Sequence, residues 1–474
     1  MENRTPRLFG ALLAGLAFMA AAAGSAAAQP AEPVRIYEEQ LRLELDQQRP
    51  WSREHTFDVG GWFNFAFLSY DDAGAGRTRK LLQYQLRPWA SMNLQGVHQA
   101  YFRALLGWND WDVGDNPNDW IDGDFEDRIE RAWYRFDLGQ LLSNRAGRPL
   151  GWGFSVKAGR QYVTFGTALA LAMPLDAVRF DGAWRDLEFT GFLGMTVNDD
   201  RNIDPSPAVP EQDRCLWGVQ LTYRGLTYHR PFAYFFANND HTQPDRSVLP
   251  TTQNYDYTTR YVGVGSSGSL LVPELTYSTE LVGEWGKTFS RNQHAGQDDV
   301  CALAYDLQLE YLFDVATRPR VNFEYIFASG DGDRGLSSVM TFGGNRPGTT
   351  DHAFNAFGFR DTGVALAPRL SNLHLFRTGA KFLPFEDILY LERLELGTNV
   401  YFYAKHKSAG PISDTTAFQD DHWLGWEWDV FLNWRVTNDL SLTSRYGVFV
   451  PGEAYSKNYN DLRNFFYAGL SLSF

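Results

Sequence analysis

The sequence has few cysteines, no long apolar run beyond its start, and no excess of positive charge. Among 474 residues only Cys215 and Cys301 are cysteines, so no disulfide framework holds the chain together. After residue 28 no apolar run reaches the roughly 20 residues of a membrane-spanning helix. The net charge is −14 and the pI about 5.1, which argues against a nucleic-acid-binding role.

Aromatic residues, in contrast, are abundant. Phe, Trp and Tyr make up 15% of the chain, and there are 43 glycines, yet the mean hydropathy is only −0.35. The chain therefore holds many bulky apolar side chains but disperses them among polar ones.

The first 28 residues have the features of a secretory signal peptide. Arg4 and Arg7 precede an apolar run over 8–23, and Ala26, Ala27 and Ala28 form a small-residue cleavage site. We therefore expect Sec-dependent export and removal of residues 1–28.

Most of the remaining chain alternates between apolar and polar residues. Trp426, Trp428 and Val430, for example, alternate with Glu427 and Asp429. The alternating segments run for about ten residues or more, the length that crosses a bilayer as a tilted strand. Strands of globular proteins average only about five or six residues.

About eighteen such segments occur, and their spacing predicts the topology. They centre near residues 63, 87, 104, 132, 157, 180, 190, 219, 234, 263, 281, 307, 323, 378, 397, 429, 444 and 469. Short connections, such as 96–97 and 438–439, alternate with long polar ones, such as 196–213 and 330–371. Because lipid offers no partner for an open sheet edge, the sheet must close. We predict an all-β, transmembrane antiparallel β-barrel of about 18 strands with short periplasmic turns and long extracellular loops.

Two further predictions concern the ends of this barrel. Residues 29–56 are expected to be a periplasmic segment, with a short helix or a plug over 35–48, and residues 57–474 the barrel. The last strand, 464–474, presents Phe466, Leu470 and Phe474 on one apolar face and is expected to pair with 57–70. A last strand that ends in Phe also resembles the signal by which barrel-assembly machinery recognises its clients.

Five stretches, in this order along the chain, carry a family resemblance. They are Leu-Arg-Pro-Trp-Ala at 86–90 with Tyr-Phe at 101–102, Glu-Arg-Ala-Trp-Tyr at 130–134 with Lys-Ala-Gly-Arg-Gln at 157–161, Pro-Arg-Leu-Ser-Asn-Leu at 368–373, Gly-Trp-Glu-Trp-Asp at 425–429, and 446–455 with the terminal strand. Together they resemble the alginate export porins of the bacterial outer membrane. The resemblance implies a monomeric 18-stranded barrel in the outer membrane.

The alternation places many basic side chains on the inward face. They are Arg87, Arg103, Arg131, Arg135, Lys157 and Arg179 in the first half and Arg377, Lys381, Arg435 and Arg445 in the second. Arginine and lysine rings inside a pore favour anions, and Arg binds carboxylates through two parallel hydrogen bonds. Arg160 has the apolar parity of its strand, so a bulge near Gly159 is expected to turn it inward.

The resemblance also implies a constriction. The family's constriction arginines correspond to Arg87, Arg131, Arg160 and Arg445, with Arg369 or Arg360 from the loop 330–371, and Asp176 corresponds to an acidic residue beside them. The channel is then expected to pass an alginate-like polyuronate or related anionic saccharides.

Two alternatives for the lumen stay open. The arginines could simply pair with lumen acids, since Glu280, Glu284, Asp306, Glu310 and Glu324 form an acidic wall on the eleventh to thirteenth strands. Such a wall equally suits a general diffusion porin for small anions or sugars.

The position of the loop 330–371 is also open. It could fold inward as a lid or lie exposed.

An enzyme is the remaining alternative class. His406 and Ser408 have the spacing of barrel lipases, but no third member of a catalytic group is evident, and we expect no enzymatic activity. No cofactor or metal is expected. The expected partners are outer-membrane lipid, the transported anion, barrel-assembly machinery and a periplasmic export partner.

Overall fold

The computed structural model describes residues 55–117, 123–197, 213–242, 255–290, 296–358, 360–385 and 387–474. The predicted signal peptide and the predicted helix or plug at 35–48 lie outside these residues. The described part contains nineteen strands and one helix. Their bounds are β1 (Thr56–Asp72), β2 (Arg77–Leu94), β3 (His98–Trp111), β4 (Gly123–Asp137), α3 (Leu138–Ala146), β5 (Trp152–Phe165), β6 (Leu171–Trp184), β7 (Leu187–Thr196), β8 (Arg214–Tyr223), β9 (His229–Asp240), β10 (Thr258–Ser269), β11 (Leu275–Phe289), β12 (Gln297–Leu312), β13 (Arg320–Ala328), β14 (Phe357–Gly358), β15 (Leu373–Phe382), β16 (Leu394–Ala404), β17 (Trp423–Arg435), β18 (Leu440–Pro451) and β19 (Arg463–Ser473).

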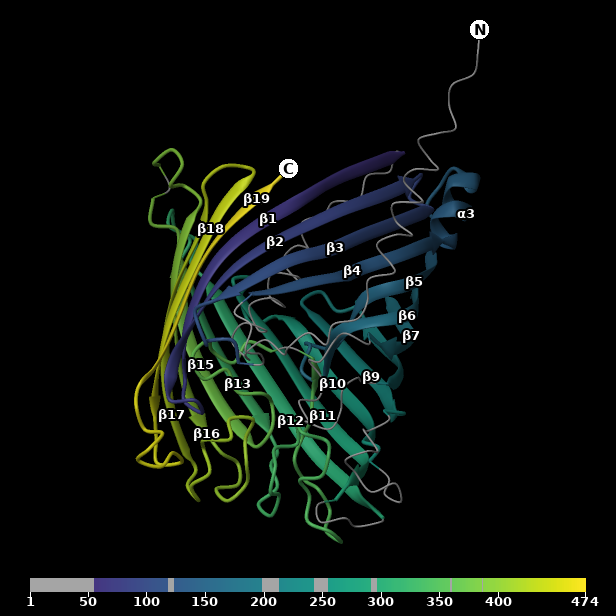
Figure 1. Cartoon of the computed structure of the whole chain (residues 1–474). Helices are drawn as coiled ribbons and strands as arrows, with labels where there is room; N and C mark the ends of the chain where they lie inside the picture. The colour runs from purple at the N-terminus through teal and green to yellow at the C-terminus, as the bar shows by residue number, and fades with distance from the viewer. Residues whose placement is uncertain are drawn as a thin grey trace.

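Apart from the two-residue β14, the strands form one closed antiparallel barrel of eighteen (Figure 1). Each pairs with its neighbour in the chain, and β19 returns to β1 from Trp62↔Ser473 to Tyr70↔Phe465. The terminal Phe474 exchanges two 3.0 Å backbone hydrogen bonds with Gly61. The predicted fold, strand number and closing pair are confirmed, and closure leaves no open edge between the first and last strands.

The alternation of the sequence becomes an outer and an inner face of the wall. Phe376, Trp428 and Leu470 are exposed on the outer face, whereas Glu427 and Asp429, on the other parity of β17, are buried. No helix among the described residues is long and apolar enough to cross a membrane.

The two ends of the barrel differ in their connections. At the end with the C-terminus and α3, most turns are brief, and we call this the short-turn end (Figure 1). The opposite end is the long-loop end. Two of its connections, 73–76 and 166–170, are nevertheless short, so loop lengths do not alternate as strictly as the sequence suggested.

The short connection 166–170 belongs to a hairpin that leaves the wall. β4 pairs with β5 only from Ala132↔Arg160 to Asp137↔Ser155, although both strands continue toward the long-loop end. The far part of β5 and the start of β6, residues 161–174, instead reach the inner faces of distant strands. We call this segment the inner hairpin; its turn contacts Gln220 of β8 and Glu280 of β11.

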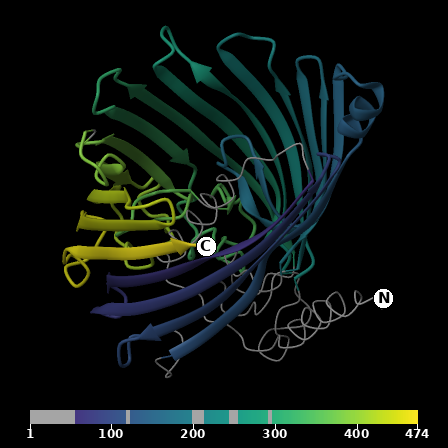
Figure 2. The ribbon, with the colours of Figure 1, turned by 90° about the horizontal axis from the view of Figure 1, so that it is seen from above.

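The connection between β13 and β15, residues 329–372, also folds into the barrel, and we call it the inner loop. Viewed along the barrel, loop segments cross the space inside the ring of strands (Figure 2). β14 of this loop pairs in parallel with β6, at Phe357↔Leu171 and Gly358↔Ala172. Phe354 and Phe357 are fully buried in an apolar cluster with the inner hairpin and the wall. The loop 330–371, for which the sequence left an inward and an exposed arrangement open, therefore folds inward.

At the long-loop end, the connection 405–422 is fastened to the wall by Asp414. The carboxylate accepts hydrogen bonds from Arg463 of β19 at 2.6 Å and from the Tyr455 hydroxyl at 3.0 Å. Burial alone would raise the pKa of Asp414, but the Arg463 guanidinium and the hydrogen bonds from Thr416 outweigh it and hold this pKa below its ordinary value. A lowered pKa means that the ionised carboxylate stabilises the folded loop.

This contribution is present above the ordinary pKa of 3.8 and is lost as pH falls through the lower folded value. We therefore expect pepsin to cleave the loop 405–422 faster as pH falls below about 3.8. In Asp414→Asn, cleavage should be faster at every pH and should lose the added dependence on acid, while exposed Asp420→Asn should behave as wild type. Equal acid dependence in Asp414→Asn and wild type would contradict this role.

Candidate functional site

Carboxylates on the inner wall hold the inner hairpin. Glu280 of β11 accepts hydrogen bonds from the Thr167 backbone N–H and the Tyr234 hydroxyl. Gly166 has φ +59, and a Cβ there would clash with the Glu280 carboxylate, so glycine permits both the turn and the close approach. The hairpin turn is thereby fixed to a strand that is not its neighbour in the wall.

A second carboxylate, Glu427 of β17, holds the inner loop. The backbone N–H groups of Val364, Ala365 and Leu366 donate to it at 2.6, 2.7 and 2.8 Å. The side chain is fully buried. A buried carboxylate without such donors would be strongly unfavourable, so its ionisation and the loop conformation depend on each other.

The third anchor is an ion network around Arg360 of the inner loop. Its guanidinium donates to Asp306 at 2.5 Å and to Glu324 at 2.6 Å, and also to the Thr167 carbonyl at 2.7 Å. Arg377 of β15 reaches the second oxygen of Glu324 at 2.6 Å. Arg360 thus links inner loop, inner hairpin and wall in one network.

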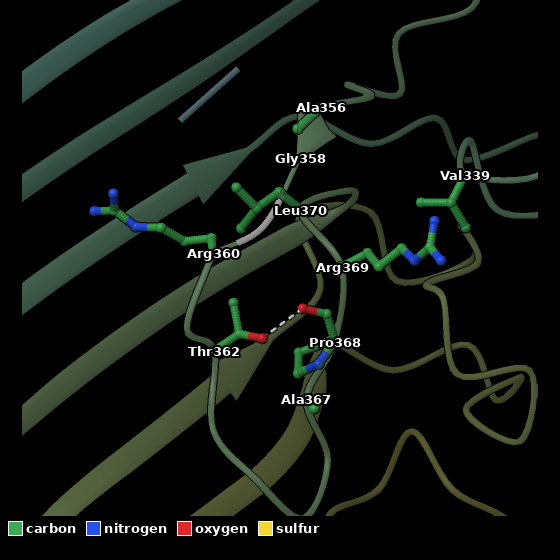
Figure 3. A pocket seen from close by; sticks show the side chains of 9 residues that line it. All are labelled: Val339, Ala356, Gly358, Arg360, Thr362, Ala367, Pro368, Arg369 and Leu370. Atoms are coloured by element: carbon green, nitrogen blue, oxygen red, sulfur yellow. Dashed lines mark hydrogen bonds between the residues drawn. The ribbon is translucent and has the colours of Figure 1, made fainter. Parts of the chain in front are cut away.

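Arg360 and Arg369 both border a small pocket within the inner loop (Figure 3). The figure shows their guanidinium groups pointing in opposite directions from it, and Thr362 donates a hydrogen bond to the Pro368 carbonyl at 2.7 Å across it. The Arg369 backbone N–H also donates to Ser413, at 2.9 Å. The two arginines that the resemblance offered as alternatives therefore occupy different environments.

Most acidic residues of the inner wall bind segments inside the barrel. Glu284 receives the Asn355 backbone N–H at 2.9 Å and the hydroxyls of Tyr257 and Tyr261. Glu280, Asp306 and Glu324 are engaged as described above. Glu310, in contrast, pairs with Arg320 at 3.6 Å and is partly exposed. The buried members of the wall therefore hold internal segments, and only Glu310 keeps the exposure that an open acidic lining would have.

On the opposite side of the lumen, arginines from consecutive strands converge on one glutamate. Arg87 of β2 and Arg103 of β3 approach the two oxygens of Glu130 at 3.2 and 2.8 Å. The β3–β4 register shifts beside Arg103, which leaves Glu130 as an extra residue in β4. This β-bulge turns both Glu130 and Arg131 inward. Two guanidinium groups thus share one carboxylate, with Arg131 beside them.

Arg160 keeps the outward parity of its strand, at the last register pair between β4 and β5. The register of β5 with β4 and β6 is continuous around Gly159, so the predicted bulge at Gly159 is wrong. The Arg131 guanidinium lies 5.2 Å from the ring centroid of Tyr162, which shares a strand face with Arg160. The inner hairpin leaves the wall at this point. Tyr162, which has the outward parity of β5, therefore turns toward Arg131 on the inner face of β4.

Arg160 is paired at this position. It binds both oxygens of Asp176 at 2.9 Å and donates to the Ile129 carbonyl at 3.0 Å, where β5 separates from β4. The structure therefore brings Arg160 and Asp176 together, as a bidentate pair.

The other predicted residues are distributed around the barrel. Arg135 binds Asp137 at 3.1 Å and Arg179 binds Asp181 at 2.8 Å, both near the short-turn end. Lys157 lies over the Trp133 ring and Arg445 over the Phe431 ring. Many of the basic residues thus pair with acids, as the alternative interpretation had it, and a single ring of unpaired arginines is not what the structure contains.

Two other sequence observations have structural outcomes. The His406 ring accepts the Gly330 backbone N–H at 3.0 Å and packs against Phe327 and His374, while the Ser408 carbonyl accepts a hydrogen bond from Lys405. Cys215 and Cys301 are free thiols. Within the described part of the chain, no group of three His, Cys, Asp or Glu side chains is placed to hold a metal ion.

Sequence reasoning missed Glu130, Tyr162 and the inner hairpin. The consecutive charges Glu130 and Arg131 interrupt the alternation, and this was the available signal for a bulge. The pairing of Arg131 with Tyr162 had no local signal, because it depends on where β5 leaves the wall.

Comparisons with known proteins agree with this architecture. A family model described as alginate export matches residues 118–468. Among solved structures, OccK5 of Pseudomonas aeruginosa has a TM-score of 0.52 at 11% identity, covering 88% of this chain and 98% of that one. OccK2 of the same organism, solved with glucuronate, has a TM-score of 0.53 at 12% identity over 88% and 98%. OccAB1 of Acinetobacter baumannii has a TM-score of 0.52 at 11% identity over 90% and 99%. No curated protein sequence matches significantly.

The Glu427 anchor can be tested with an isosteric change. Glu427→Gln removes one of two acceptor oxygens and the charge, which should cost the docked loop roughly 3 kcal/mol, the value of one to two charged hydrogen bonds. We expect noisier and larger single-channel currents and faster proteolysis of the inner loop, with the barrel itself intact. Glu395→Gln, on β16 and paired with Lys381, is the matched control. Identical current noise in wild type and Glu427→Gln would show that this anchor does not hold the loop.

Proposed function

Since the chain belongs to the alginate export family and forms an outer-membrane channel, we propose that it passes an anionic polysaccharide of the alginate-like polyuronate class, or related anionic saccharides. In this assignment the short-turn end faces the periplasm and the long-loop end the exterior. Transport is passive movement along the basic side of the lumen.

The observation that carries this proposal is the cluster of three guanidinium groups that β2, β3 and β4 place around Glu130. Arg87 and Arg103 share the single carboxylate of Glu130, and Arg131 adds a third cation on the next strand. Adjacent strands lie about 4.8 Å apart, so these groups form a short row. All three side chains are buried, so they attract a polymer with one carboxylate per sugar through the positive potential of this side of the lumen.

The engagement of the acidic wall supports the same proposal. Buried Glu284 and Glu427 receive backbone N–H groups of the inner loop, and Asp306 binds Arg360. A wall carboxylate that is paired with a guanidinium group, as Asp306 is with Arg360, repels a passing anion less than an unpaired one of the same charge. The apparent conflict between an acidic wall and an anionic solute is thereby reduced.

The proposal includes the route of the protein and its partners. Residues 1–28 serve as a Sec signal peptide, barrel-assembly machinery recognises the last strand, and the channel works as a monomer with a periplasmic export partner. It has no enzymatic activity. A general diffusion porin for small anions or sugars is the second candidate, favoured by the inner loop that narrows the lumen.

Planar-bilayer recordings test the proposal. The channel should prefer anions, and added oligouronate should block the current. Arg131→Gln should lower the anion preference about two- to threefold because it removes one of three neighbouring cations. Arg185→Gln, an exposed arginine in the turn between β6 and β7, should change nothing. Anion preference without any oligouronate block would favour the diffusion porin, and cation preference without block would refute both.

A further inference from the structure

The ladder between β4 and β5 ends part of the way along both strands. The last register pair is Ala132↔Arg160, and beyond it β5 turns inward as the inner hairpin while β4 continues toward the long-loop end. Figure 1 shows β4 diverging from β5 and β6 in that direction. On the far flank, Asp176 of β6 is still paired with Met195 of β7. We call the interruption between Gly123–Ile129 of β4 and this flank the side opening.

The edge of β4 at the side opening carries backbone groups without a ladder. The Ile129 carbonyl points away from β3, because it accepts a hydrogen bond from Arg160 of β5 at 3.0 Å. Alternate residues of a strand turn their N–H and C=O to the same side, so those of Asp127 and Phe125 also point away from β3. No described strand or loop bonds to these two residues on that side. Acyl chains cannot satisfy such groups, which occur at membrane depth only where protein or water reaches them.

Charged side chains gather on the outer face of the wall at the same place. Asp127 is exposed there, between two exposed apolar residues of its own strand, and its register partner on β3 is Leu106. Arg160 and Asp176 also have outward parity, and their paired side chains are 22% and 47% exposed. A charged side chain that faces the lipid around a barrel is strongly unfavourable. Three such charges at one interruption of the ladder therefore indicate water, and not acyl chains, at this part of the wall.

Apolar side chains frame these charges on the lipid side. Phe125 and Ile129 of β4 and Leu193 and Met195 of β7 are all exposed on the outer face. Thr164, on the outward-parity face of the inner hairpin, is exposed as well. The side opening thus has a polar threshold and an apolar frame.

We propose that the side opening is a water-filled lateral passage by which an amphiphile, a molecule with a polar head and an apolar tail, moves between the lumen and the outer leaflet. This activity is separate from the proposed passage of anionic saccharides. The head meets Asp127, Arg160 and Asp176, and the tail lies along the exposed apolar side chains of β4 and β7, which keeps its surface out of water. A wholly polar solute gains nothing by leaving the lumen toward lipid. The threshold holds two carboxylates and one guanidinium, so it favours a neutral or cationic head over an anionic one.

Thiol labelling tests whether water reaches the side opening. In a background with Cys215→Ser and Cys301→Ser, Asp127→Cys in proteoliposomes should react with a charged, membrane-impermeant methanethiosulfonate at least about 100-fold faster than Leu106→Cys, because the reactive thiolate forms in water and not in lipid. Leu106 is the matched position, since it is the register partner of Asp127 on the same outer face. Equally slow reaction of both variants would show that this edge is covered and would overturn the inference.

Single-channel recordings test the passage itself. Dodecyltrimethylammonium, added below its micellar concentration, should reach the opening from the membrane and block the current, whereas tetramethylammonium, the same head without the tail, should not block at equal concentration. Asp127→Leu should lower the rate of these blocks about tenfold, because it removes a carboxylate from the threshold. Asp110→Leu, exposed on the outer face of β3 nearer the long-loop end, should block as wild type does. Retention of the heat-resistant folded form on electrophoresis shows that each variant has folded.

The outcomes decide between a passage and a mere gap. If Asp127→Cys reacts rapidly but the two ammonium ions block alike, or if Asp127→Leu keeps the wild-type block rate, the opening passes no amphiphile and the inference is wrong. Tail-dependent blocks that weaken in Asp127→Leu and persist in Asp110→Leu support it. The proposed function is judged separately, by the oligouronate block, which Asp127→Leu should leave unchanged.

Discussion

Buried carboxylates on the inner wall are the constraint on which the interior of this barrel depends. Glu280, Glu284, Asp306, Glu324 and Glu427 are nearly or fully inaccessible to solvent. Ionised groups are strongly unfavourable there unless donors surround them. The donors come from the inner hairpin and the inner loop, so these segments must be in place for the wall itself to be satisfied. Wall and interior are therefore specified together.

The consequence is a lumen with two unlike sides. Toward β6–β17 the inner hairpin and inner loop pack against the wall with a large apolar cluster, which includes Phe165, Phe236, Phe354 and Phe357. Toward β1–β5 the wall carries Arg87, Arg103 and Arg131 around Glu130. Most of the buried acidic residues lie on the first side and are engaged there, whereas the buried charges of the second side are mainly arginines.

Most of the barrel could be predicted because its signal is local. A strand in a bilayer-spanning barrel needs about ten alternating residues, and the pattern around Trp428 or Leu470 is complete within its own segment. The terminal strand also reveals its pairing, since closure requires the first and last strands to meet. Each predicted strand centre falls within an observed strand, and the helix α3 lies in the connection between β4 and β5.

The sequence by itself thus determined the barrel, its number of strands and the face on which most side chains lie. The reason is that the alternation of side chains between the two faces of a strand can be recognised within one short segment. Only the tertiary structure decided that Arg160 pairs with Asp176, that Glu130 joins Arg87 and Arg103, and that the acidic wall holds the inner loop. These contacts join residues far apart in the chain, as Thr167 and Glu280 are. They depend on where a hairpin leaves the wall and on how a long loop folds back, and no local pattern specifies either.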